Sequence, residues 1–333
     1  MGVKGYKAFN KGMICEGKQY EENATYEENG NEICEAGVMH FCENPFDVLN
    51  YYPLVDENGG ISDFADVEAI GDIYKEKDKT ATNKLHIGAK LGLKGFIKAC
   101  VDFTIEKTRV ESGKDNETDS SGDSAQIGSS GDSAQIGSSG YSAQIGSSGY
   151  FAQIGSSGDS AQIGSSGDSA RIGSSGDSAR IGSSGDYAQI GSSGDSAQIG
   201  SSGDSARIGS SGYSAQIGSS GYFAKIGSSG DYAQIGSSGD SARIGSSGYF
   251  AKITSKGKHS VVMAAGYNSI AKAKIGSWIT LAEWIRTDKT DDSDNYIWIP
   301  KCVKTECVDG ERIKEDVFYK LVDGEFKEVE SEE

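Results

Sequence analysis

Isoleucine recurs at every ninth position from residue 127 to residue 253, and an alanine stands two positions before each isoleucine. These positions belong to fifteen consecutive copies of a unit typified by Gly-Asp-Ser-Ala-Gln-Ile-Gly-Ser-Ser, which starts at Gly122. Within the unit, alanine, isoleucine and the following serine alternate with glutamine and glycine. This period of two predicts a strand of about five residues with alanine and isoleucine facing inward. The remaining Ser-Gly-Asp-Ser has the residue types of a turn.

One strand and one turn in each copy reverse the chain once, so two copies of nine residues close a coil of 18 residues. A fixed short period with an apolar residue in every copy is typical of a solenoid. We therefore predict a thin roll of two parallel sheets, one built from the odd copies and one from the even copies. The alternative is a disordered Gly/Ser linker, because the chain has 47 glycines and 3 prolines. A linker, however, does not need alanine and isoleucine in register.

The region before the repeat has a mixed pattern. Residues 1–110 predict a small α+β domain, in which residues 6–9 and 64–70 form strands. Asn44-Pro45 is typical of the start of a capped helix, and the polar residues 111–121 predict a hinge. A second helix is indicated by apolar residues that share one helical face: Phe96, Ile97, Cys100, Val101 and Ile105.

The region after the repeat, residues 276–333, predicts a small antiparallel β cap that ends in an acidic tail. Asp309-Gly310 and Asp323-Gly324 are typical of hairpin turns. The predicted fold class is therefore mainly β. A nonapeptide β-solenoid, a two-sheet β-roll over residues 122–275, lies between the small α+β N-terminal domain and the cap.

Charge and leader signals set the expected location. The formal net charge is −17, which argues against nonspecific nucleic-acid binding by the whole molecule. Met1-Gly2-Val3-Lys4 does not lead into the apolar core of a secretory signal, and no run approaches about 18 apolar residues. We expect a cytoplasmic monomer or homodimer in a bacterial cell, with no membrane contact and with its six cysteines reduced.

Two resemblances extend these expectations. The segment Lys4-Gly5-Tyr6-Lys7-Ala8-Phe9, together with His40–Leu49, resembles a domain of unknown function in phage, prophage and gut-bacterial proteins. In those proteins a similar domain precedes short Gly/Ser-rich repeats and a tail like Ile275-Gly276-Ser277-Trp278 and residues 309–314. The resemblance implies a phage or mobile-element origin and no particular activity. The repeat unit is also similar to the β-roll repeats of trimeric autotransporter heads, which trimerise through an apolar outer face; the outward residues here are Gln, Arg, Lys and Gly.

The variable positions of the repeat suggest a binding face. Four of the six basic residues at the outward position belong to even copies, and three aromatic residues follow the Asp/Tyr position of even copies. These residues are Arg171, Arg207, Lys225, Arg243, Phe151, Tyr187 and Phe223. Like charges on neighbouring coils repel each other, so this set predicts contact with phosphates and bases or with an acidic protein surface. The alternative is that Gln, Arg and Lys are interchangeable solubilising residues.

The turn positions form a second pattern, with aspartates stacked along both edges of the predicted roll and tyrosines replacing some of them. The residues are Asp159, Asp177, Asp195, Asp168, Asp186, Asp204, Tyr141, Tyr150, Tyr213 and Tyr222. Rows of carboxylates suggest DNA mimicry toward a DNA-binding protein. The calcium-binding nonapeptide consensus does not fit this unit. The alternative is ordinary aspartate turn chemistry.

Catalytic and cofactor sites are not indicated. Cys34, His40 and Cys42 lack the paired Cys-x-x-Cys of a zinc site, and no phosphate loop, nucleophile elbow or dinucleotide fingerprint occurs. We therefore expect a non-enzymatic protein without metal or cofactor.

The expected function is that of a phage or mobile-element protein that engages a host protein or nucleoprotein complex through the solenoid surface. Inhibition of a defence or DNA-handling complex, including by DNA mimicry, is one version; direct nucleic-acid binding is less favoured. The alternative is a structural or adhesive virion component such as a tail-fibre segment, which predicts a trimer.

Overall fold

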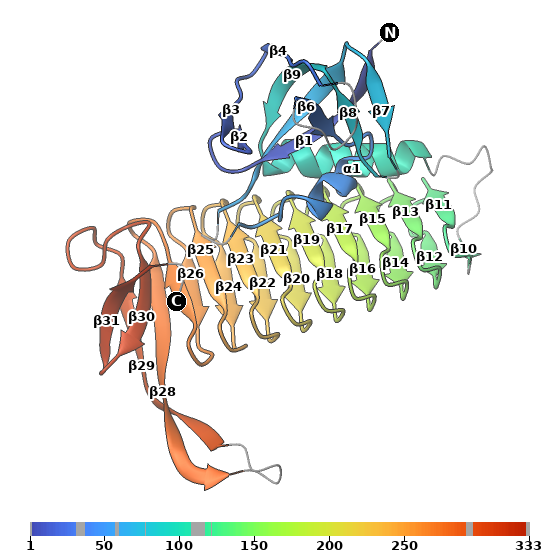
Figure 1. The fold of residues 1–333 in the computed structure, drawn as a ribbon. Coiled ribbons are helices and arrows are strands. Elements are labelled where there is room, and N and C mark those ends of the chain that lie inside the picture. The colour runs from blue at the N-terminus through green and yellow to red at the C-terminus, as the bar shows by residue number, and fades with distance from the viewer. Residues whose placement is uncertain are drawn as a thin grey trace.

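Three bodies follow one another along the chain in the computed structural model: an α+β domain, a solenoid and a pair of C-terminal hairpins (Figure 1). The structure describes residues 2–30, 37–56, 60–76, 78–107, 117–120, 122–290 and 296–330. The mainly β architecture and the 18-residue coil are both confirmed, and the solenoid makes about nine turns between residues 126 and 281.

The N-terminal domain is built on an antiparallel sheet of order β1-β6-β9-β4, with a smaller sheet of order β5-β8-β7 beside it. Its elements are β1 (Val3–Phe9), β2 (Ile14–Cys15), β3 (Lys18–Gln19), β4 (Thr25–Glu27), β5 (Met39–Phe41), the 3-10 helix η1 (Pro45–Asn50), β6 (Asp63–Ala69), β7 (Ile73–Lys75), β8 (Thr80–Thr82), β9 (Lys84–Leu91) and the helix α1 (Leu93–Lys107). The predicted strands at 6–9 and 64–70 lie in β1 and β6. The predicted helix after Asn44 is η1, in which the Asn44 side chain accepts a hydrogen bond from the Phe46 backbone N–H at 3.1 Å.

Helix α1 lies between the N-terminal sheet and the solenoid (Figure 1). The predicted apolar face is confirmed at Phe96, Ile97, Cys100 and Val101, which are all buried; the Ile105 side chain is outside the described residues. Phe96 stacks on Phe64 of the sheet with ring centroids 3.8 Å apart. Helix α1 therefore presents apolar side chains both to the N-terminal sheet and to the solenoid.

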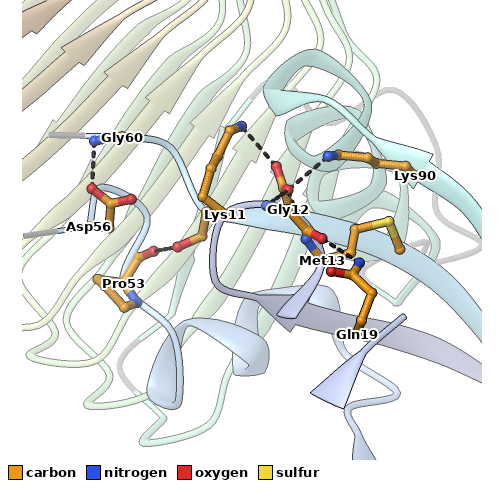
Figure 2. Close-up of polar contacts among 10 residues, drawn as sticks. Lys11, Gly12, Met13, Gln19, Pro53, Asp56, Gly60 and Lys90 are labelled. Atoms are coloured by element: carbon orange, nitrogen blue, oxygen red, sulfur yellow. Dashed lines mark hydrogen bonds and ion pairs between the residues drawn. The ribbon is translucent and has the colours of Figure 1, made fainter. Parts of the chain in front are cut away.

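A buried carboxylate fixes the tight loop between β1 and β2, which contains Lys11, Gly12 and Met13 (Figure 2). Asp63, which is 3% exposed, accepts hydrogen bonds from the backbone N–H groups of Gly12 and Met13 at 2.8 and 3.2 Å. The ammonium groups of Lys11 and Lys90 approach the same carboxylate at 3.0 and 2.7 Å. The pKa of Asp63 is lowered below its ordinary value, because these hydrogen bonds outweigh the opposing effect of burial.

The solenoid consists of two parallel sheets whose strands alternate along the chain. The odd sheet contains β11 (Gln126–Ser129), β13 (Gln144–Ser147), β15 (Gln162–Ser165), β17 (Arg180–Ser183), β19 (Gln198–Ser201), β21 (Gln216–Ser219), β23 (Gln234–Ser237), β25 (Lys252–Ser255) and β27 (Ile270–Lys272). The even sheet contains β10 (Glu117–Ser120), β12 (Gln135–Ser138), β14 (Gln153–Ser156), β16 (Arg171–Ser174), β18 (Gln189–Ser192), β20 (Arg207–Ser210), β22 (Lys225–Ser228), β24 (Arg243–Ser246), β26 (Val261–Ala264) and β28 (Trp278–Thr290).

The repeat folds this way because each invariant residue has one task. From Ala134 to Ala251 the repeat alanines are 0% exposed, and the repeat isoleucines are at most 4% exposed, so the two columns fill the space between the sheets. Each strand pairs with the strand 18 residues away in register. The turn glycines stack closely: a methyl group on Gly158 would lie 1.8 Å from the carbonyl oxygen of Gly140. No larger residue fits at that position.

Antiparallel hairpins close the C-terminal end of the solenoid. Strand β28 continues the even sheet and then pairs with β29 (Tyr296–Cys307), while β30 (Phe318–Val322) and β31 (Glu325–Val329) extend the odd sheet. Both parallel sheets thus end on an antiparallel hairpin, and β29 and β31 are the edge strands at this end. The predicted turn at Asp323-Gly324 joins β30 to β31, with φ values of 52° and 72°.

Two local predictions were wrong. Asp309-Gly310 is not a hairpin turn, because β29 and β30 belong to different sheets and residues 308–317 cross between them. Part of the predicted hinge is a strand: β10 pairs with β12, so residue 117 already belongs to the even sheet. The rest of the hinge, residues 111–116 and 121, lies outside the described residues. The alanine and isoleucine of the repeat are absent from β10, so the sequence pattern did not predict this strand.

Candidate binding face of the solenoid

The outward surfaces of the two sheets, here called the odd face and the even face, have the same repeat sequence but different surroundings. In β15, β17, β19, β21 and β23 the strand glycine is buried and the preceding Gln or Arg is half-buried. In β14, β16, β18, β20 and β22 both positions are exposed. The odd face is therefore covered and the even face is open.

The N-terminal domain covers the odd face by filling its glycine column. A methyl group on Gly200 would lie 2.1 Å from Cδ1 of Ile97 in α1, and one on Gly218 would lie 3.3 Å from Cδ2 of Leu54. A methyl group on Gly164 would lie 3.2 Å from Cα of Val101. The column of strand glycines is thus a groove that receives a helix and its neighbouring loop.

Polar contacts fix this docking. Arg180 lies 3.4 Å from Asp47 and also donates to Asn50, while the Gln162 side chain donates to Asp47 at 3.3 Å. Burial raises the pKa of Asp47 above its ordinary value although Arg180 opposes the shift, and burial lowers the pKa of Arg180. The one arginine of the odd column is therefore neutralised by the chain's own carboxylate.

The even face has the same groove without an occupant. A methyl group placed on Gly155, Gly173, Gly191, Gly209 or Gly227 would meet no other atom within 4 Å. These glycines and the outward side chains line a shallow trough with a volume of about 1320 Å³. No contact within the fold requires glycine at these five positions, in contrast to the turn glycines.

The structure places the basic residues predicted for this face along the trough. Arg171, Arg207, Lys225 and Arg243 all line it, and β20, β22 and β24 bring the last three onto neighbouring strands. Over the described residues, none of the four forms an ion pair with a carboxylate. Because like charges on adjacent strands repel, an anionic partner would relieve an unfavourable arrangement.

The predicted aromatic residues stand beside the basic column. Tyr187 and Phe223 form a recess of about 430 Å³ together with Arg207, Lys225 and Arg243. Phe151 forms a second recess, of about 330 Å³, with Arg171. Successive rings are two coils apart, roughly 10 Å at the usual strand spacing.

The backbone conformation at these aromatic residues is energetically unfavourable for a bulky side chain. Phe151, Tyr187 and Phe223 have φ values of 57°, 57° and 56° and side chains that are 60%, 63% and 60% exposed. A bulky residue in the left-handed region costs about 1 kcal/mol or more, and these rings bury little area to offset it. Serine occupies the same position in the intervening coils, Ser169 and Ser205. Fold stability alone does not explain the rings.

The even face changes character at its C-terminal end. Val261, Met263 and Trp278 take the outward positions of β26 and β28 and are 50%, 45% and 48% exposed. The methyl group of Met263 closes the glycine trough, since it would lie 3.6 Å from a methyl group on Gly245. The open face therefore combines a basic column, an aromatic row and an apolar end.

Carboxylates of the aspartate ladders accept hydrogen bonds from backbone N–H groups of the next coil. Asp186 accepts a hydrogen bond from the Asp204 backbone N–H at 2.8 Å, and Asp204 accepts one from Tyr222 at 2.9 Å. Asp168 and Asp195 make the same contact to the next coil on their own edges. For these four aspartates, the geometry favours turn chemistry over a free carboxylate row. Asp159 and Asp177 occupy the corresponding positions on the edge of Asp195.

The predicted edge tyrosines are divided between the two edges. Tyr141 and Tyr213 lie on the edge of Asp195, and Tyr150 and Tyr222 lie on the edge of Asp204; their side chains are between 50% and 57% exposed. Tyr213 contacts Tyr232, with ring centroids 5.1 Å apart. The four residues therefore do not form a single surface.

The ladder geometry gives a direct prediction. Asp186→Asn keeps an oxygen that accepts from the Asp204 N–H, so the free energy of unfolding is expected to change by less than about 0.5 kcal/mol. Asp186→Ala removes the acceptor and is expected to cost about 1 kcal/mol. Urea denaturation of both variants checks this. Equal losses in the two variants would show that the hydrogen bond is not what the aspartate provides.

Within the described ranges, no three His, Cys, Asp or Glu side chains form a group that could hold a metal ion; Cys34, one of the three residues considered for zinc, lies outside them. The five described cysteines are all free thiols. No described helix is long and apolar enough to cross a membrane.

Sequence reasoning missed the asymmetry of the two faces. The available signal was the outward glycine of every strand, because a column without side chains leaves room for a packed element. It also missed a pocket in the N-terminal domain, lined by Lys7, Cys15 and His40.

The comparison with known proteins concerns the part of the chain that docks on the odd face. Residues 3–99 match the family described as Domain of unknown function (DUF7666). The chain thus has an N-terminal DUF7666 domain followed by a β-solenoid. The match includes η1 and the N-terminal part of α1, and hence Asp47, Leu54 and Ile97, which contact the solenoid. No curated protein and no solved structure matched the chain.

Proposed function

We propose that this chain is a non-enzymatic interaction protein of a phage or mobile element, and that the even face of its solenoid binds an anionic macromolecule of the host. A defence or DNA-handling complex is the class of partner that fits this role, with the chain acting as its inhibitor. The observation that supports the proposal most is the contrast between two equivalent glycine grooves, one filled by the DUF7666 domain and one open.

The filled groove indicates which partner shape suits the open one. On the odd face the groove receives apolar side chains of a helix, while Asp47 meets Arg180 at one side. The even face has the same glycine column with four cations along it, which form no ion pair with a described carboxylate. An acidic protein segment with an apolar ridge, such as a helix, would satisfy the groove, the cations and the apolar end together.

The experiment is capture of partners from a bacterial host lysate. Wild-type chain is expected to retain a macromolecule that the variant Arg207→Glu/Lys225→Glu/Arg243→Glu loses. Charge reversal of three residues at one interface is expected to weaken binding by about a hundredfold or more, and high salt should weaken it further.

A charge-matched control separates the face from the net charge. Lys4→Glu/Lys94→Glu/Lys107→Glu introduces the same change in charge at exposed positions of the N-terminal domain and is expected to retain the partner. Retention by both variants, or loss in both, would contradict the proposal.

The alternatives give different outcomes. DNA mimicry by the edge ladders predicts that Asp→Asn changes across residues 159–204 abolish capture while the basic variant retains it. Direct nucleic-acid binding predicts that nuclease treatment of the lysate abolishes capture. A tail-fibre role predicts a trimer in light scattering, whereas the proposal expects a monomer or homodimer.

A further inference from the structure

The N-terminal domain contains a pocket of about 490 Å³ that the solenoid does not cover. It is lined by β1, the β2–β3 loop, β5 and the segment after η1. Its walls combine polar and aromatic side chains, with Tyr6, Tyr51, Tyr52 and Phe41 among the aromatic ones. This volume suits a ligand of small-metabolite size.

Lys7 is the unusual residue of this pocket. Lys7 is only 6% exposed. Its ammonium group donates a hydrogen bond to the backbone carbonyl oxygen of His40 at 2.8 Å. The same ammonium group lies 5.7 Å from the ring centroids of Phe9 and Tyr20. Among the residues that the structure describes, no carboxylate lies within ion-pair distance of it. A buried charge without a counter-ion is strongly unfavourable.

Other polar residues line the same pocket. Nε2 of His40 is buried and has no hydrogen-bond partner in the described structure. The Tyr52 hydroxyl group donates to the sulfur of Cys15 at 3.1 Å. The pocket also has Glu16 at its lining, an exposed residue, and Lys79. Burial lowers the pKa of Lys7, so that an anion beside it would restore the charged form.

We propose that this pocket binds a small organic anion, a carboxylate or a phosphate monoester with an apolar body. The anionic group lies at Lys7 and His40, and the apolar body lies along Tyr51 and Tyr52. The ammonium group without a carboxylate partner, the imidazole nitrogen without a hydrogen-bond partner among the described residues, and the aromatic side chains together define this ligand class. The inference is independent of the function proposed for the even face.

The test is isothermal titration calorimetry of the full chain with three probes: benzoate, phenyl phosphate and the neutral isostere benzamide. Benzoate or phenyl phosphate is expected to bind, and benzamide is expected to bind about tenfold or more weakly. Which anion binds more tightly distinguishes a carboxylate from a phosphate site. Absence of binding by both anions, or equal binding of benzamide, would overturn the proposal.

Two further measurements separate ligand binding from folding. Lys7→Met removes the buried charge and is expected to abolish anion binding without lowering the thermal midpoint, whereas Lys4→Met on the same strand is expected to bind like wild type. The better anion is also expected to slow alkylation of Cys15 by iodoacetamide in the wild-type chain, followed by peptide mass spectrometry. Unchanged binding in Lys7→Met, or unchanged Cys15 alkylation, would contradict the assignment.

Discussion

Gly200→Leu is expected to release the N-terminal domain from the solenoid, whereas Gly209→Leu is expected to leave the fold intact. A methyl group on Gly200 already lies 2.1 Å from Ile97, which is 2% exposed. A leucine therefore forces α1 away from the odd face, because overpacking at a filled contact costs about 1–3 kcal/mol. Gly209 occupies the equivalent position of the even sheet, and a methyl group placed there would meet no described atom within 4 Å.

Small-angle X-ray scattering provides the measurement. The radius of gyration is expected to rise for Gly200→Leu and to stay at the wild-type value for Gly209→Leu. A strand position favours leucine over glycine, so the solenoid itself should not lose stability in either variant. Equal scattering profiles for the two variants would show that α1 does not dock through the glycine column.

Asp63→Asn is expected to destabilise the N-terminal domain by about 2 kcal/mol at pH 7, because hydrogen bonds to a charged group carry about 1.5–3 kcal/mol. The amide of asparagine cannot accept on both sides, and Lys11 and Lys90 lose their counter-charge. Asp66→Asn, at an exposed position of the same strand, is expected to cost less than about 0.5 kcal/mol. Equal losses in these two variants would contradict the role assigned to Asp63.

The pH dependence follows from the lowered pKa of Asp63. A carboxylate with a folded pKa below its unfolded value stabilises the fold above the unfolded pKa, about 3.9. This stabilisation disappears as the pH falls through the lower folded pKa. The difference between wild type and Asp63→Asn in urea denaturation is therefore expected to be constant above about pH 5 and to shrink at lower pH.

The solenoid could be predicted because its main features follow from two periods in the sequence. The period of two around Ile127 determines which side chains face inward, and the nine-residue period determines the coil. Strand β10 could not be predicted, because Thr118 stands where the repeat has isoleucine, although the strand pairs in register with β12. Likewise, the residues of Asp309-Gly310 are those of a hairpin turn, while the partner sheets of β29 and β30 decide the path.

The candidate site could be predicted only in part. The parity of the copies predicted that Arg207, Lys225 and Arg243 lie together, since strand pairing in a roll follows directly from the period. Which face is open depends on where α1 docks, and that contact joins residues about 100 positions apart, such as Ile97 and Gly200. Lys7 has the appearance of a surface residue in an alternating strand, and only its surroundings show it to be buried.

The partner is expected to bind the even face of the solenoid. Hydroxyl-radical footprinting of the chain with and without its captured partner tests this most directly, because exposed aromatic side chains react readily and each edge of the roll has its own. Tyr187 and Phe223, beside the basic column, are expected to become protected in the complex, while Tyr141 and Tyr213 on the opposite edge keep their free reactivity. Protection of Tyr141 and Tyr213 with Tyr187 and Phe223 unchanged would contradict it.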